Sequence, residues 1–286
     1  MQNIFRLHAD LRAGTYQHGR YHAFKINDPK PRAIHKASVR DRLLHHAIYR
    51  QLYPFFDRTF IADSYSCRTN KGTHRAMNRF RTFAYQVSKN NTRTCWVLKC
   101  DIRKFFASID HTVLKSILAS YIPDLRILSL LDSVIDSFCP GLPLGNLTSQ
   151  LLVNVYMNDF DQYVKHELKA TCYLRYADDF IVLSSNRKEL HEILSYVKVF
   201  LLERLALELH PKKVSIGTLA AGVDFLGWVH FPDHRVLRTS TKRRMLRRVR
   251  EREGDAATVA SYLGLLSHGN TRKLHAIISA WIPRIG

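Results

Sequence analysis

The stretch Leu174-Arg-Tyr-Ala-Asp-Asp-Phe-Ile-Val-Leu183 places two adjacent carboxylates, Asp178 and Asp179, between two apolar runs. Short apolar runs around a polar corner predict a β-hairpin with the acids at its turn. An isolated Asp-Asp pair is usually just a turn element, because Asp is common in turns. Apolar strands on both sides change that interpretation, since burying charge without a metal or partner is costly. The hairpin therefore predicts a functional site at its corner.

A third carboxylate follows another apolar run. Cys95-Trp-Val-Leu-Lys-Cys100 predicts a buried strand that ends at Asp101. If this strand neighbours the hairpin in one sheet, the three acids converge. Phosphoryl transfer needs charge neutralisation and in-line positioning, which two divalent metal ions supply, and Mg²⁺ takes carboxylate oxygen ligands. We therefore predict that Asp101, Asp178 and Asp179 are the catalytic metal ligands.

The remaining elements indicate an α+β fold in which helices pack on a sheet. Residues 21–40 predict two short strands around a turn at Asp28-Pro29-Lys30-Pro31. Apolar spacing predicts helices over 40–53, 73–89, from His111, 147–168 and 187–206, strands over 214–216 and 223–231, and a helical, basic end over 240–286.

Charge indicates the partner. Lys and Arg number 44 against 24 Asp and Glu, a formal net charge of +20. Such an excess favours a nucleic-acid partner over a merely solvated basic surface. Five cysteines, an odd number without a CxxC pair, indicate reduced thiols. With no signal peptide and no membrane-length apolar run, we expect a cytoplasmic protein of a bacterial, archaeal or phage-infected cell, with no membrane partner.

Five boxes, in order, resemble those of reverse transcriptases. They are Lys99-Cys-Asp-Ile-Arg-Lys-Phe-Phe106, Gly141-Leu-Pro-Leu-Gly-Asn-Leu-Thr-Ser-Gln150, Tyr176-Ala-Asp-Asp179, Leu209-His-Pro-Lys-Lys-Val214 and Phe225-Leu-Gly-Trp228. The resemblance implies a right-hand polymerase with an antiparallel palm sheet backed by helices and a short helical thumb. Its fingers would begin in residues 1–94, its palm with the remaining fingers elements would span 95–235, and its thumb would span 236–286.

The resemblance also implies roles at the reaction centre. Asp101 and Asp178 would ligate two Mg²⁺ ions, with Mn²⁺ as an alternative, and Asp179 would assist. Lys213 is the predicted proton donor to the leaving pyrophosphate, with Lys212 second; a plain surface lysine is the competing interpretation.

Phe106 would be a steric gate that excludes a 2′-hydroxyl and so selects deoxynucleotides. Phe105 would pack in the core, because neighbours on a strand face opposite sides.

The other expected contacts are with the nucleotide and the primer. The predicted nucleotide-binding residues are Arg68, Lys71, Arg75, Ile102, Phe106, Leu144, Gly145 and Gln150, and the predicted primer grip, at 225–228, includes Phe225, Leu226 and Gly227. Which of the first three clamps the triphosphate is left open, beside the alternative of a solvated basic loop. The basic segment 242–252 is expected to follow the duplex backbone as a thumb helix, which predicts salt-sensitive binding.

Two positions indicate which group of reverse transcriptases the chain resembles. Most reverse transcriptases have Gln-Gly-x-x-x-Ser-Pro where this chain has Leu144 and Gln150 at the first and last positions. That variant resembles the enzymes of diversity-generating retroelements, as does Asp28-Pro-Lys-Pro-Arg32. The resemblance implies copying of a template-repeat RNA into cDNA with errors at adenines, and a small basic accessory protein. The alternatives are a retron, group II intron-like or defence-associated reverse transcriptase, or a catalytically silent nucleic-acid-binding module.

Overall fold

The acid-bearing hairpin forms part of a four-stranded sheet. Strands β4 (Tyr173–Tyr176), β5 (Asp179–Ser184), β3 (Trp96–Asp101) and β6 (Ser215–Thr218) lie in the order β4-β5-β3-β6. The predicted hairpin and the strand that ends at Asp101 are thus confirmed, and they are neighbours. Five of the six residues of β5 are buried, as the apolar run predicts.

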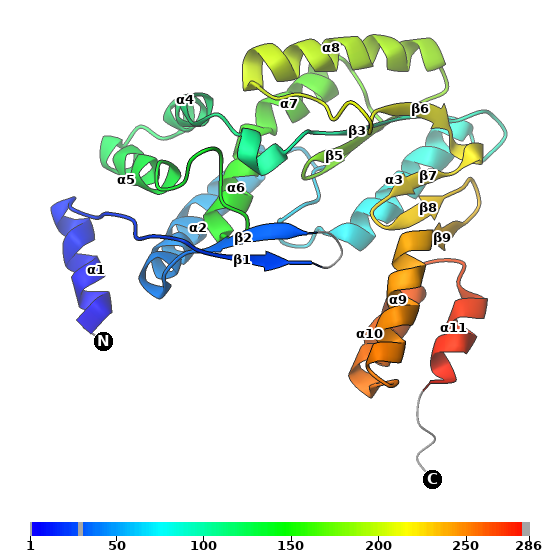
Figure 1. Ribbon diagram of the computed structural model, residues 1–286. Helices are drawn as coiled ribbons and strands as arrows, with labels where there is room; N and C mark the ends of the chain where they lie inside the picture. Colours follow the sequence, from blue (N-terminus) through cyan, green and yellow to red (C-terminus); the bar gives the residue numbers. More distant parts are fainter. Residues whose placement is uncertain (1, 28–30, 282–286) are drawn as a thin grey trace. The chain divides into compact units, whose positions relative to one another are not determined.

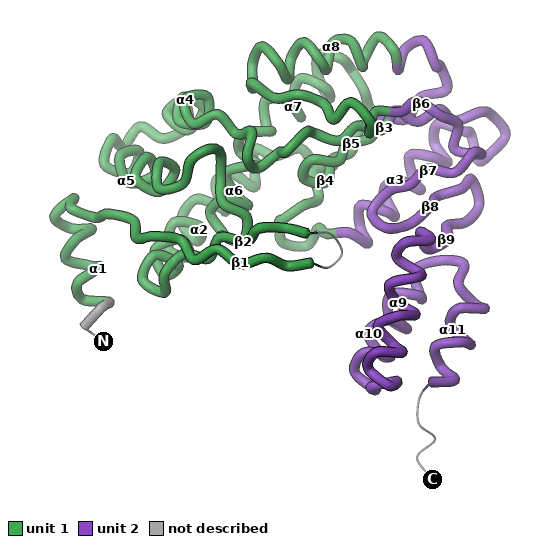
Figure 2. The backbone as a smooth tube through the Cα atoms, viewed as in Figure 1, with its two compact units in different colours: residues 1–72, 99–181, 191–214 green, residues 73–98, 182–190, 215–286 purple. Residues whose placement is uncertain are grey.

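The computed structural model describes residues 2–27 and 31–281 (Figure 1). The predicted turn at Asp28-Pro29-Lys30 lies outside the described residues. The chain divides into two compact units, each assembled from separate stretches (Figure 2). The first comprises residues 1–72, 99–181 and 191–214, and the second residues 73–98, 182–190 and 215–286. The fingers, palm and thumb boundaries stay a prediction.

The first unit carries most of the helices. Strands β1 (His22–Ile26) and β2 (Arg32–Lys36) pair antiparallel, which confirms the predicted short strands. Its helices are α1 (Gln2–Ala13), α2 (Val39–Thr59), α4 (His111–Tyr121), α5 (Leu125–Ile135), α6 (Leu147–Tyr156), α7 (Asn158–Gln162) and most of α8 (Arg187–Leu205). Helix α2 begins where the side chain of Ser38 accepts a hydrogen bond from the Asp41 amide.

The prediction of one long helix over 147–168 is wrong. Helix α6 ends at Tyr156, α7 follows, and Tyr163–Glu167 forms a π-helical turn. Met157, with φ of −86° and ψ of −4°, is a turn residue between the two α-helices. The amide of Leu168 bonds to the carbonyl of Tyr163 five residues earlier, at 3.0 Å. Apolar spacing runs through both changes, so the sequence does not indicate them.

The second unit combines a small sheet with a helical end. Strands β7 (Val223–Phe225), β8 (Trp228–His230) and β9 (Arg235–Leu237) form an antiparallel sheet. The prediction of one strand over 223–231 is wrong, because Leu226 and Gly227 form a two-residue turn with φ of 52° and 86°. The other elements are α3 (Thr73–Ser88), a short 3₁₀ turn Leu219–Ala221, α9 (Thr239–Glu251), α10 (Ala256–Leu266) and α11 (Arg272–Ser279).

The helical end predicted over 240–286 is confirmed as far as the described residues extend. It is held by one apolar core, which consists of Met77, Trp228, Leu237, Met245, Val249, Val259, Leu266 and Ile278. No helix in the described part of the chain combines the length and the apolar character that a bilayer crossing demands.

Candidate active site

The end of β3 and the hairpin corner meet through the backbone. The amide of Ile102, one residue after Asp101, donates to the carbonyl of Asp178 at 3.1 Å. Ala177 turns the corner with φ of 56°, in the left-handed region. The three predicted metal ligands are therefore carried by adjacent strand ends of one sheet.

The three acids also interact electrostatically. Burial raises the pKa of Asp178, and the negative charge of Asp101 raises it further. Burial is also the main cause that raises the pKa of Asp179 to about 6; the Lys99 ammonium lowers it, whereas Asp178 and Asp101 raise it. The charge of Asp101 thus disfavours ionisation of both Asp178 and Asp179.

Lys213 is held beside this group by a segment that runs along the end of β3. The amide of His210 donates to the carbonyl of Asp101 at 2.7 Å, and the amide of Arg103 donates to that of Glu208 at 2.8 Å. Lys213 Nζ lies 2.6 Å and 2.8 Å from the two carboxylate oxygens of Asp101. Lys213 is therefore next to Asp101 although its side chain is 43% exposed, and its role as proton donor stays a prediction.

The donor set suits a divalent metal ion, which reverse transcriptase domains generally use. Carboxylate oxygens are the ligands that Mg²⁺ prefers, and Asp101, Asp178 and Asp179 offer them at adjacent strand ends. Within residues 2–27 and 31–281, no group of three or more His, Cys, Asp and Glu side chains is arranged to hold a metal. The ammonium of Lys213 forms an ion pair with Asp101 in the same place.

The loop before α6 packs on the segment after Asp101. The amide of Leu142 donates to the carbonyl of Phe106 at 2.7 Å. Gly141 has φ of 70°, and a Cβ there would lie 2.2 Å from the same carbonyl oxygen. Only glycine fits this approach. The loop and the predicted steric gate are thus brought together.

Phe106 is in a different local structure from the one predicted. Phe105–Ser108 form a 3₁₀ turn after Lys104, whose φ is 46°. The strand argument for opposite faces is therefore wrong, although Phe105 is buried and Phe106 is partly exposed. The gating role of Phe106 stays a prediction.

The predicted nucleotide-binding loop pairs with β2. The amide of His35 donates to the carbonyl of Leu144 at 2.9 Å, and Asn146 Nδ2 donates to the His35 carbonyl at 2.8 Å. Gly145 has φ of 106° and faces Ile34, whose Cγ2 lies 2.7 Å from where a Cβ would be. Strand β2 also carries Arg32, whose charge lowers the pKa of Asp178.

Gln150 is partly buried in the first turns of α6, and its carbonyl accepts a hydrogen bond from Asn154 Nδ2 at 3.3 Å.

The three candidates for the triphosphate clamp lie in different settings. Arg68 has a side chain only 5% exposed, and it bonds to the Asp57 carboxylate at 2.7 Å and to backbone carbonyls. Lys71 Nζ donates to the carbonyl of Ala62 at 2.7 Å. Arg75 is exposed on α3 in the second unit. These contacts make Arg68 a support of its own loop, and clamping by any of the three stays a prediction.

The predicted primer grip lies in the second unit. Phe225 is fully buried, with its ring 5.9 Å from that of Phe80, and Leu226 and Gly227 form the β7–β8 turn. The Gly227 carbonyl accepts a hydrogen bond from the Arg238 amide at 3.1 Å. Primer contact by this turn stays a prediction.

Two basic residues near the acids were given no role from the sequence. Arg32 follows the Asp28–Pro31 segment, and no signal in the sequence places it near Asp178. Arg175 is fully buried, and its Nη1 donates to the carbonyl of Ala177 at the corner, at 3.0 Å. The signal for Arg175 is visible in retrospect, because an arginine in the middle of an apolar strand requires buried partners.

Comparison with known proteins agrees with this geometry. The protein family described as reverse transcriptase (RNA-dependent DNA polymerase) matches residues 25–230. The match includes β3, the corner acids and the segment that carries Lys213.

Two curated relatives extend over most of the chain. Protein YkfC from Escherichia coli is 26% identical over 74% of this chain, and the group II intron-encoded protein LtrA from Lactococcus lactis is 22% identical over 85% of it. The chain spans 65% of the length of the first and 51% of the second.

Solved structures show the fold. Telomerase from Candida albicans superposes with a TM-score of 0.60 at 11% identity, covering 80% of this chain and 48% of its own. Telomerase from Candida tropicalis gives a TM-score of 0.58 at 12% identity, covering 76% of this chain and 48% of its own. The fold is thus that of an α+β polymerase. Together with the family match over residues 25–230, these findings show that the chain belongs to the reverse transcriptase family.

Proposed function

We propose that this chain is an RNA-directed DNA polymerase that uses Asp101, Asp178 and Asp179 to transfer nucleotides to a primer. The observation that supports this most directly is the hydrogen bond from the Ile102 amide to the Asp178 carbonyl, which joins the two acid-bearing strand ends. Family membership supports the reaction class.

In the proposed reaction the carboxylates of Asp101, Asp178 and Asp179 would hold two Mg²⁺ ions, with Mn²⁺ as an alternative. The ions would supply neutralisation of the phosphate charge. The residues of the chain do the rest. Lys213, already at the carboxylate of Asp101, is the proposed proton donor to pyrophosphate, and Phe106 is the proposed gate against the 2′-hydroxyl.

Primer extension on an RNA template with deoxynucleotides and Mg²⁺ tests this proposal. We expect extension by the wild type and a loss of at least about 1000-fold in Asp178→Ala, because the transition-state charge is no longer neutralised. Asp132→Ala, which removes a more exposed acid from α5, is the matched control and should retain activity. Equal inactivity of wild type and Asp178→Ala with RNA binding intact would favour a silent binding module.

A finer proposal is that the chain belongs to a diversity-generating retroelement and copies a template-repeat RNA with errors at adenines. Its support is the sequence at Leu144 and Gln150. The Leu144 carbonyl and the Asn146 side chain are both hydrogen-bonded to His35 of β2, and the side chain of Leu144 is partly exposed. An amide at this position can hydrogen-bond a nucleotide or template base, whereas Leu cannot, and a lost polar contact reduces discrimination.

Sequencing of the cDNA tests the finer proposal. Leu144→Gln should lower the error rate at template adenines relative to the other three bases, with total extension retained. Leu142→Met, in the same loop but buried, is the control and should leave the error spectrum unchanged. Adenine errors that are equal in wild type and Leu144→Gln would contradict the proposal.

A group II intron-like enzyme is the second candidate, because LtrA is similar over 85% of this chain. An enzyme of that kind is expected to copy adenines as accurately as other bases in the same assay.

The proposed partners are an RNA template and the RNA/DNA hybrid, deoxynucleoside triphosphates and a small basic accessory protein. The support for nucleic acid is charge. Helix α9 buries Met245 and Val249 in the core of the second unit. It exposes Lys242, Arg243, Arg247 and Arg250 to solvent. This arrangement suits contact with a phosphate backbone.

A further inference from the structure

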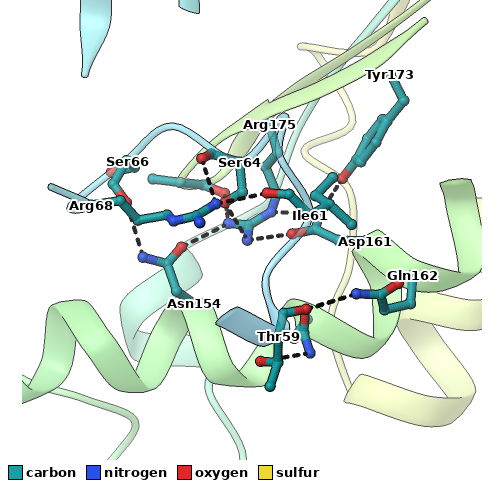
Figure 3. Close-up of polar contacts among 12 residues, drawn as sticks. Thr59, Ile61, Ser64, Ser66, Arg68, Asn154, Asp161, Gln162, Tyr173 and Arg175 are labelled. Atoms are coloured by element: carbon teal, nitrogen blue, oxygen red, sulfur yellow. Dashed lines mark hydrogen bonds and ion pairs between the residues drawn. The ribbon is translucent and has the colours of Figure 1, made fainter. Parts of the chain in front are cut away.

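Arg175 lies on β4, two residues before the corner, with a side chain that is completely buried. All five N–H donors of its guanidinium have an acceptor. Figure 3 shows Arg175 among Asp161, Asn154 and Ser64, which provide three of its four partners. Nε and Nη2 bind the two oxygens of Asp161 at 2.8 Å and 2.7 Å. The remaining donors bind Asn154 Oδ1 at 3.3 Å, the Ala177 carbonyl at 3.0 Å and Ser64 Oγ at 3.2 Å.

These acceptors come from four separate parts of the first unit. Asp161 is on α7, Asn154 is on α6, Ser64 is in the loop after α2, and Ala177 is at the catalytic corner. Asp161 is further fixed by the hydroxyl of Tyr173 at 2.6 Å. A fully buried ion pair is a weak source of stability, because desolvation offsets most of its attraction. The planar guanidinium of Arg175 therefore serves mainly to fix the positions of its partners.

The backbone of Arg175 also bonds to the loop after α2, which contains Ser64. Its amide donates to the carbonyl of Asp63 at 2.9 Å, and its carbonyl accepts from the amide of Tyr65 at 3.0 Å. Asn154 Nδ2 also donates to the Ser66 carbonyl at 2.9 Å. The loop that leads to Arg68 and Lys71 is thus joined to β4 through both the main chain and the side chain of one residue.

We propose that Arg175 is a positioning residue that fixes the catalytic corner and the loop of residues 63–68 in one arrangement. Through the Ala177 carbonyl it sets where Asp178 and Asp179 lie, and through Ser64 and the bridge to β4 it sets where the loop lies. This inference rests on the proposed polymerase function. It adds that one guanidinium aligns the loop of residues 63–68 with the catalytic corner. A change at Arg175 should therefore disturb both of them together.

Steady-state primer extension with Arg175→Lys tests the inference. Lysine keeps the charge beside Asp161 but loses the planar fork, so it cannot reach all four partners. We expect kcat to fall on the order of 100-fold, the effect of a misplacement of about 1 Å, while the Kd for RNA stays within about threefold. Arg126→Lys, at a side chain that is 94% exposed on α5, is the matched control and should be unchanged.

Ser64→Ala tests the contact of Arg175 with the loop by itself. It removes the hydrogen bond between Arg175 and Ser64 and leaves the ion pair with Asp161 intact. We expect the KM for deoxynucleotides to rise several-fold with a smaller change in kcat, at an unchanged Tm. If Arg175→Lys does not fold, this variant decides the question. Unchanged kinetics in Ser64→Ala would then overturn the inference.

Amide hydrogen exchange supplies a readout that does not need activity. In Arg175→Lys, we expect faster exchange together at Tyr65 and at the corner residues 177–179, with α4 protected as in the wild type. Exchange that rises at only one of the two places, or kinetics of Arg175→Lys within twofold of the wild type, would overturn the inference. A wild type and Arg126→Lys that both fail to extend a primer would instead count against the proposed function.

Discussion

Replacement of Asp179 by Asn should stabilise the metal-free protein, by an amount that grows with pH. Burial raises the pKa of Asp179 from 3.8 to about 6, so ionisation costs the folded state more than the unfolded chain. The contribution of this group to stability is full below pH 3.8 and is lost as the pH rises through 6. The difference of about two units corresponds to about 3 kcal/mol at pH 8, and to about 1.6 kcal/mol at pH 5.

Urea denaturation in EDTA at pH 5 and pH 8 measures this difference. The free energy of unfolding of Asp179→Asn should exceed that of the wild type by a margin that widens by about 1.4 kcal/mol between the two pH values. Asp233→Asn is the control, and it should lower the free energy of unfolding and not raise it. Hydrogen bonding to His234 lowers the pKa of this exposed acid, so its ionised form is the one that stabilises the fold. A margin at pH 8 equal to that at pH 5, or a less stable Asp179→Asn at pH 8, would refute the reasoning. The same variant should lose polymerase activity, which would show that the acid is kept at a cost to stability.

Other variants test other parts of the structure. Gly141→Ala should lower the free energy of unfolding by about 2–4 kcal/mol in urea, because its φ of 70° and a backbone carbonyl 2.2 Å from the new Cβ both oppose a side chain. Gly217→Ala, with nothing within 4 Å, should change it by less than about 1 kcal/mol. Lys213→Met should lower kcat by about 100-fold or more with little change in the KM for deoxynucleotides, measured by primer extension. A large rise in KM with kcat unchanged would indicate a role in nucleotide binding instead. Arg247→Gln and Arg250→Gln should each reduce the slope of log affinity against log salt for an RNA/DNA duplex by about 1, and unchanged slopes would remove α9 from the duplex interface.

The hairpin and the strand before Asp101 could be predicted because local sequence decides them. The run after Asp179 is apolar without interruption, and the run before Asp178 is interrupted only by Arg175. Short apolar runs of this kind favour buried strands. The approach of Asp101 to the corner was a conditional prediction. It depended on which strands are neighbours, and strand order is set by tertiary packing, which no residue of either run encodes alone.

Helix continuity and turn geometry were harder to predict. Apolar spacing is the same on both sides of Met157, so the sequence did not reveal the break in the helix there. Leu226-Gly227 is a two-residue turn in which a leucine takes a positive φ, a conformation that a bulky residue rarely adopts. Sequence preferences alone gave no reason to divide the strand there, whereas pairing of Phe225 with Trp228 requires it.

The polar contacts around the acids depend on residues that are distant in the sequence. Lys213 reaches Asp101 because residues 208–210 run beside residues 101–103, and Arg32 acts on Asp178 from a strand near the N-terminus. Arg175 was visible in the motif, but its partners on α6, α7 and the loop after α2 were not. A sequence motif thus identifies the acids, while the cations that balance them emerge only from the fold.

The ion pair between Lys213 and Asp101 also affects the charge balance of the site. The Lys213 ammonium binds both oxygens of Asp101, the same atoms that a divalent ion needs. The charge of Lys213 also lowers the pKa values of Asp178 and Asp179, which burial raises. Because the side chain of Lys213 is 43% exposed, it can leave Asp101 without exposing an apolar surface. We therefore predict that Lys213 can move from Asp101 to the leaving pyrophosphate, as the proposed role of proton donor requires.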